Sequence, residues 1–158
     1  MEARKKLKVK LTQLKDPSVV ELVRMTDHKI LAHWAIDCTE RVMPYFEGEF
    51  PDDERPRRAL EVLRQWMSTG TFKMAEIRKA SLDSHVAARQ VGKDDAARSA
   101  ARAAGQAVAT AHVPAHSIGA AIYALQAIYR TTDSIDAMEK EQEWQYSHLI
   151  ELRKKRRT

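Results

Sequence analysis

The sequence predicts an all-α fold, a bundle of six or seven helices around a central Ala-rich helix. Apolar residues recur at spacings of three and four through most of the chain, and period-two alternation is confined to K-L-K-V-K-L near the start. Residues 94–112 consist largely of alanine, so a helix there has little apolar surface of its own and requires neighbours that approach its backbone closely. No repeat of 34 or 40 residues is present, which argues against a solenoid.

The first half of the chain predicts four helices. Asp16 followed by Pro17 is a typical helix start and opens a short helix to about residue 25. The next helix is expected over 27–47, capped by Thr26 or Asp27. A third is expected to follow Asp52 or Asp53 and to end at Gly70, and a fourth to run over 73–91. The apolar positions expected to face the core are Ile30, Leu31, Trp34, Ala35, Cys38, Val42, Phe46, Ala59, Val62, Leu63, Trp66, Met67, Ile77, Ala80, Ser84, Ala87 and Val91.

Three further helices are expected in the second half. The Ala-rich helix begins at Asp94 or Asp95 and ends near residue 112, because Pro114 disfavours helical geometry in the residue before it. Pro114 opens the next helix. The last begins at Asp133 and carries a lengthwise packing seam that two Gln side chains should leave only partly buried. The seam residues are Ile135, Met138, Gln142, Gln145, Leu149 and Leu152.

The charge distribution separates the ends of the chain from its body. The chain has 158 residues and a formal net charge of +5, but residues 1–10 contribute +4 and residues 153–157 contribute +5, so residues 11–152 carry −4. We expect one helical domain over 1–158, with basic, loosely ordered ends at 1–15 and 153–158. The single cysteine excludes an internal disulfide, and no membrane span or secretory signal is apparent, which predicts a cytoplasmic protein.

The histidine spacing does not predict a metal site. His112 and His116 have the separation of two ligands on one helical face, but Pro114 interrupts the helix between them. Neither H-E-x-x-H nor E-x-x-H occurs, so no metal or other cofactor is expected. We expect His112 to bond the last carbonyls of the Ala-rich helix and His116 to lie, neutral, in the first turn of the next helix.

Two arginine stripes leave two interpretations open. Arg78, His85 and Arg89 share one helical stripe, and Arg98 and Arg102 share another. The guanidinium groups could converge on an anion, or they could pair internally with the many carboxylates of the chain, which is the favoured interpretation.

Three segments carry a resemblance to a known family. They are W-A-I-D-C-T-E-R-V at 34–42, D-D-E-R-P-R-R-A-L-E at 52–61 and the Ala-rich block A-A-R-A-A-G-Q-A-V-A-T-A-H-V-P-A-H-S-I-G-A-A-I-Y-A at 100–124. Together they resemble the immunity-five-like family of all-helical immunity proteins, over about residues 30–130. The resemblance implies a protein that binds and neutralises a toxin encoded beside it. We expect the D-D-E-R-P-R turn to meet the charged and imidazole side chains of the Ala-rich helix, largely in a structural role. The candidate polar cluster is Trp34, Asp37, Arg41, Asp52, Asp53, Arg55, Arg58, His85, Arg89, Arg102, His112 and His116.

Three functions follow as hypotheses. The leading one is a non-enzymatic protein-binding factor, an immunity protein whose mildly acidic body covers the basic surface of a toxin. One alternative is a nucleic-acid-binding helical module that uses the basic termini, which would bind weakly and without sequence preference. The other is a helical enzyme with an anion or metal site near His85, Arg89, His112 and His116. The heptad-like spacing of the last helix makes a homodimer a further expectation.

Overall fold

The computed structural model describes residues 14–155 and is all-helical over that range, which confirms the predicted fold class. Eight helices are present there, so the predicted count of six or seven is too low. They are α2 (Pro17–Arg24), α3 (His28–Glu40), α4 (Met43–Glu47), α5 (Arg55–Thr69), α6 (Met74–Gln90), α7 (Ala96–Ala109), α8 (His116–Thr132) and α9 (Ile135–Lys155). Within the described range, no helix combines the length and the apolar character needed to cross a bilayer.

The additional helix arises because the segment predicted as one helix over 27–47 is divided into α3 and α4. Pro44 lies in the first turn of α4. A proline inside a continuous helix would remove one backbone hydrogen bond and press its ring against the carbonyl one turn earlier. The chain therefore ends α3 at Glu40, and a tight turn in which the Val42 N–H donates to the Thr39 carbonyl at 2.9 Å precedes α4.

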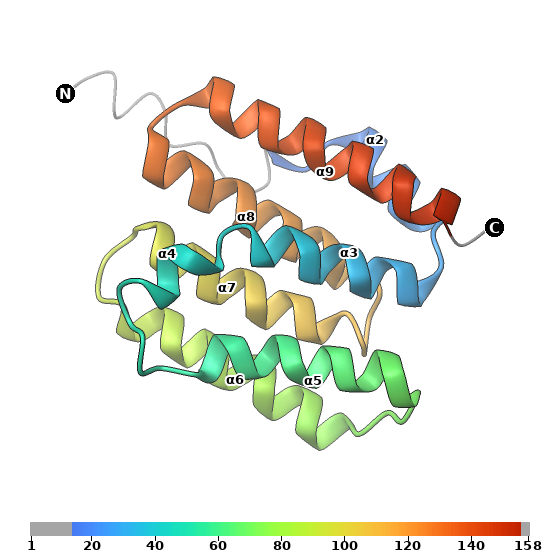
Figure 1. Ribbon diagram of the computed structural model, residues 1–158, viewed down its shortest axis with the longest axis horizontal. Helices are drawn as coiled ribbons and strands as arrows, with labels where there is room; N and C mark the ends of the chain where they lie inside the picture. Colours follow the sequence, from blue (N-terminus) through green and yellow to red (C-terminus); the bar gives the residue numbers. More distant parts are fainter. Residues whose placement is uncertain (1–13, 156–158) are drawn as a thin grey trace.

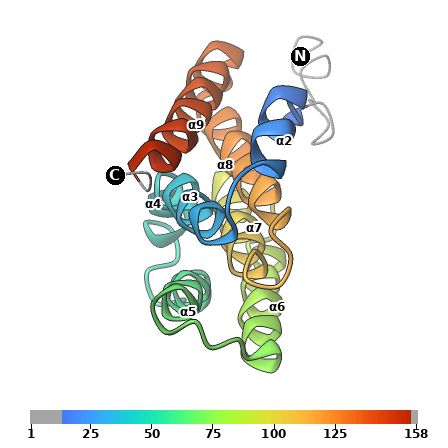
Figure 2. The same cartoon turned by 90° about the vertical axis from the view of Figure 1, so that its right-hand side faces the viewer.

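The Ala-rich helix α7 occupies the middle of the bundle, as predicted. Figures 1 and 2 show it between α3 and α8 on one side and α5 and α6 on the other. Ten of its fourteen residues are buried, and among these only Val108 has a side chain larger than serine. Small side chains bring neighbouring backbones close, so α7 is stabilised by what surrounds it rather than by large side chains of its own.

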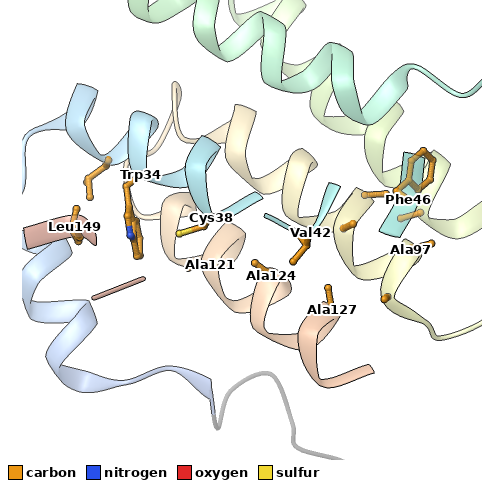
Figure 3. Packing of buried hydrophobic residues seen from close by; sticks show 14 of the residues in the cluster. Trp34, Cys38, Val42, Phe46, Ala97, Ala121, Ala124, Ala127 and Leu149 are labelled. Atoms are coloured by element: carbon orange, nitrogen blue, oxygen red, sulfur yellow. The ribbon is translucent and has the colours of Figure 1, made fainter. Parts of the chain in front are cut away.

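Two apolar clusters both include buried residues of α7. One joins α3, α4, α8 and α9 and contains Trp34, Phe46 and Leu149, as seen from close by in Figure 3. The other joins α7 to α5 and α6, with further residues from α3, α4 and α8, and includes Leu60 and Leu63. Cys38 is fully buried in the first cluster, where burial raises the pKa of its thiol, as expected of a small apolar residue rather than a nucleophile.

The helix starts agree with the sequence only in part. The side chain of Asp16 accepts from the Ser18 N–H at 2.8 Å, and that of Asp95 accepts from the Arg98 N–H at 3.1 Å, so both act as N-caps. Glu54, rather than Asp52 or Asp53, precedes α5. Asp133, predicted to start the last helix, instead ends α8 in a left-handed conformation with φ 54°. The hydroxyl of Ser134 accepts from the Ala137 N–H at the start of α9.

The seam of the last helix is only partly buried, as predicted, with Gln142 half-buried and Ile135 exposed, but its second glutamine lies in the core. Gln145, expected to be partly buried, is only 3% exposed. Its side-chain amide donates to the Ala121 carbonyl at 3.0 Å, and its backbone carbonyl accepts from the Trp34 indole N–H at 2.8 Å. A buried polar group satisfied in this way specifies how α9 sits on α3 and α8.

The ends of the chain lie largely outside the described residues. Residues 153–155, assigned by the sequence to a loose end, continue α9. The guanidinium of Arg153 donates to the Thr26 hydroxyl at 2.7 Å, which fixes this part of α9 to the turn after α2. The remaining basic positions proposed for nucleic-acid binding, at 4–10 and at 156 and 157, are outside that range.

Candidate functional site

The twelve candidate residues fall into separate groups rather than one constellation. Trp34, Asp37 and Arg41 lie where α3 meets α9, and residues 52–58 meet α6. His85, Arg89, Arg102 and His116 gather on the face formed by α6, α7 and α8. His112 lies in the turn after α7, exposed beside Phe72 with the two ring centroids 6.0 Å apart, and near enough to His116 for its positive charge to help lower the pKa of that ring. It was expected to bond the last carbonyls of α7 through its side chain, and that prediction is wrong: the carbonyls of Ala107, Val108 and Ala109 accept from backbone N–H groups of residues 110–113 instead.

Arg41 anchors the contact between α3 and α9. Its guanidinium donates to both oxygens of the Glu141 carboxylate, at 2.6 and 2.9 Å, and its carbon lies 3.8 Å from the centre of the Trp144 ring. The Glu141 hydrogen bonds raise the pKa of Arg41. The Glu141 side chain is only 8% exposed, so its charge depends on this bidentate partner.

Asp37 continues the same contact one turn earlier on α3. Its carboxylate lies 2.6 Å from Nε2 of His148 and 3.3 Å from Nε2 of His33. Because an ionised carboxylate only accepts, each imidazole presents its Nε2 proton to Asp37. The His148 ring also stacks on Trp144. Sequence reasoning missed these partners on α9 because they lie about a hundred positions further along the chain and share no motif with α3.

The D-D-E-R-P-R turn is held together by its own residues and by α6. The Arg55 guanidinium donates to both oxygens of Asp53, at 2.9 and 2.7 Å, and to the side-chain oxygen of Gln90 at 2.6 Å. These bonds lower the pKa of Asp53 and raise that of Arg55. Beside them lies an open cavity of about 360 Å³ lined by Asp52, Asp53, Glu54, Arg55, Arg58, Ala80 and Asp83.

The turn does not meet the charged side chains of α7, so that prediction is wrong. Among residues 14–155, no hydrogen bond or ion pair joins positions 52–55 to a side chain of α7. The polar side chains of α7 instead bond Asp94, just before the helix, and residues of the neighbouring helices α6 and α8.

A residue outside the candidate set, Arg57 of α5, links three helices: it donates to Glu40 of α3 and to Glu47 of α4, the latter at 2.6 Å. The run of neighbouring arginines gave no signal as to which of them would pair.

His85 and Arg102 form the central pair of the α6–α7–α8 face. Nη1 of Arg102 lies 2.9 Å from Nδ1 of His85. Arginine can only donate, so Nδ1 accepts and the neutral ring carries its proton on Nε2. Burial, together with the nearby positive charges of Arg102 and Arg89, lowers the pKa of His85 to about 4. The ring lies against Gly105 of α7, where a Cβ atom would be 2.7 Å from Nε2.

His116 forms a second hydrogen-bonded pair on this face. Its Nδ1 lies 2.9 Å from the side-chain oxygen of Gln106, and burial lowers its pKa, as expected for a neutral imidazole in the first turn of α8. Within residues 14–155, no group of three or more His, Cys, Asp or Glu side chains has the arrangement of a metal site.

Comparison with known proteins assigns the chain to a family. Residues 21–152 match the family model described as "Imm-5 like putative immunity protein". The match covers α3 to α8 completely, half of α2 and most of α9, and so includes every group described above. No curated protein and no solved structure matches the chain. The chain therefore belongs to this Imm-5 like family.

Proposed function

We propose that this protein acts without catalysis, by binding a toxin protein and covering the surface with which the toxin works. The observation that carries the proposal is the family match over residues 21–152, which spans nearly the whole helical bundle. Inhibition by binding requires a stable scaffold with an exposed complementary surface, and charge complementarity supplies both fast association and selectivity.

The outer face of α9 provides a suitable surface. Figure 1 shows α9 at the edge of the bundle, with one side facing away from the other helices. Glu139, Glu143 and Tyr146 follow one another at spacings of four and three, so they share a helical face, and all three are exposed. Neither glutamate has an ion-pair partner among the described residues. Tyrosine is enriched in protein interfaces, because its ring contributes contact area and its hydroxyl a hydrogen bond.

The charge of this region favours a basic partner surface. Residues 133–151 contain six Asp or Glu and a single Lys, whereas the turn and the α6–α7–α8 face contain many arginines. A concentration of unpaired carboxylates around an exposed aromatic residue complements the basic surface of a toxin that acts on nucleic acid. The side of α9 opposite Glu143 is fixed by Glu141, Gln145 and Leu149, so the acidic face is held on a rigid element.

The test begins with capture of the partner. The full-length chain, carrying an affinity tag, is purified from cells of its native host, and each recovered protein is then expressed alone and together with the chain. We expect a recovered protein that arrests growth when alone and is tolerated when the chain is co-expressed. Failure to recover any such protein contradicts the proposal.

A matched pair of variants then tests the surface. Glu139→Lys combined with Glu143→Lys should weaken binding of the captured partner by at least tenfold, measured by calorimetry at low and at moderate salt. Glu54→Lys combined with Glu61→Lys reverses the same amount of charge at exposed positions immediately before α5 and in its middle, and should leave affinity nearly unchanged. Equal effects of the two pairs would show that the partner responds to net charge rather than to α9.

A further inference from the structure

Two arginines on the outer stripe of α7 differ in how their charges are balanced. Arg98 donates to the Asp94 carboxylate at 2.6 Å and to the Ala88 carbonyl at 3.1 Å. Arg102, one turn later, has no carboxylate partner among the described residues, and its one hydrogen bond is to the neutral imidazole of His85. Internal ion pairing, the interpretation favoured by the sequence, therefore holds for Arg98 and fails for Arg102.

The environment of Arg102 adds positive charge and hydrogen-bond donors. Arg89 lies near enough for its positive charge to disfavour protonation of His85, and it also lacks an ion-pair partner in the described range. No carboxylate is among the charges that act on His85. Nδ1 of His85 accepts a hydrogen bond from one N–H of the Arg102 guanidinium, which fixes the side chain while the remaining N–H groups of the fork stay available. Arg102 is half-buried and Arg89 is exposed, so both can be reached from solvent.

We propose that Arg102, held by His85 and assisted by Arg89, binds a single oxyanion group on the face formed by α6, α7 and α8. The planar guanidinium fork matches the two oxygens of a carboxylate or of a phosphate, and a partly buried position strengthens such a bond relative to one on the open surface. The inference is independent of the toxin-binding proposal, since it concerns a different face and needs no partner protein.

The surroundings favour one oxyanion over a polyanion. Residues 11–152 hold 17 Lys or Arg against 21 Asp or Glu. Asp83 lies on α6, and Asp94 lies just before α7. A nucleic acid requires a continuous basic stripe along its backbone, whereas two adjacent guanidinium groups suffice for one phosphate or carboxylate.

The experiment measures the Nε–Hε signals of arginine in the full-length protein by ¹⁵N NMR at pH 7 and low ionic strength. Inorganic phosphate in one series and glutarate in another are the probes. We expect a saturable shift of the Arg102 signal in the millimolar range with at least one of them, and the tighter probe indicates whether the natural ligand offers a phosphate or a carboxylate. Shifts that grow linearly for all arginines, as sodium chloride produces, would overturn the proposal.

Variants separate this site from general electrostatics. Arg102→Gln should weaken binding of the probe by at least tenfold, and Arg89→Gln by a smaller factor. Arg98→Gln is the matched control, because it removes the same charge from the same stripe at an arginine already paired with Asp94, and it should change the affinity by less than twofold. Circular dichroism establishes that each variant is folded. Equal losses in Arg98→Gln and Arg102→Gln, or tighter binding of a 12-nucleotide single strand at the same residues, would contradict a site for one oxyanion.

Discussion

Gly105 is the position at which a single added methyl group tests the packing of the α6–α7–α8 face. It lies inside α7, where alanine is otherwise the commonest residue and is also the better helix former. A Cβ atom there would lie 2.7, 2.8 and 2.9 Å from three atoms of the His85 ring. An ordinary contact between such atoms is about 3.5–4.0 Å, so the ring must move by about 1 Å. Gly105 is therefore required because of its neighbour rather than because of its backbone conformation.

The expected change in stability follows from three contributions. Overpacking of this kind costs about 1–3 kcal/mol. Displacement of the ring also breaks the hydrogen bond from Arg102, which adds about 1.5 kcal/mol for a bond with a charged donor. Against these, replacing glycine by alanine inside a helix contributes about 1 kcal/mol of stability. Gly105→Ala should thus lower the free energy of unfolding by about 2 kcal/mol.

Gly119→Ala in α8 is the matched control. Its Cβ would lie 2.6 Å from the side-chain oxygen of Gln106, which is the end of a flexible side chain and can rotate away, at the cost of its neutral hydrogen bond with His116 of about 1 kcal/mol. The same gain in helix propensity applies, so this variant should stay within about 1 kcal/mol of the parent protein. Urea unfolding followed by circular dichroism measures both. If Gly105→Ala proves as stable as the parent or more so, the ring of His85 does not pack against α7 as described.

Three further changes test other contacts. Arg41→Met leaves the buried Glu141 carboxylate unpaired and should lower the free energy of unfolding in urea by about 2–3 kcal/mol. This is less than the roughly 3–5 kcal/mol of a fully buried pair, because the Arg41 side chain is 42% exposed. Adding Glu141→Gln should restore part of the lost stability, and no restoration would refute the pairing. Asp95→Ala removes the N-cap of α7 and should lower the melting temperature by the equivalent of about 1 kcal/mol, whereas Asp94→Ala, which loses an exposed ion pair, should cost less than about 0.5 kcal/mol. The pKa of His85 is about 4 in the fold against 6.5 for a free histidine, so the unfolded chain binds more protons between these values, and stability should fall as the pH drops from about 6.5 to about 4. Solvent screening limits this loss to about 1–2 kcal/mol, and His85→Gln should flatten the pH profile of unfolding; an unchanged profile would contradict a neutral His85.

The sequence by itself determined the helical class, the central place of the Ala-rich helix and most of the buried faces. These properties depend on local periodicity and on side-chain size: a helix of alanines has no stable position except between neighbours, and α7 lies there. Helix ends did not follow from the sequence to the residue, because several adjacent carboxylates compete to cap the same start. Pro44 indicates the division between α3 and α4, but the apolar positions from Ile30 to Phe46 keep one helical spacing across it, which favoured a single helix.

Only the tertiary structure decided which polar side chains meet. The sequence joined the candidate residues into one cluster, whereas the fold distributes them over the α3–α9 contact, the turn before α5 and the α6–α7–α8 face. Arg41 finds Glu141 a hundred positions away, and the D-D-E-R-P-R turn finds α6 instead of the charged stripe of α7. Ion pairs of this kind depend on which helix faces lie opposite one another, and helix packing sets that through the apolar side chains rather than through the charges themselves.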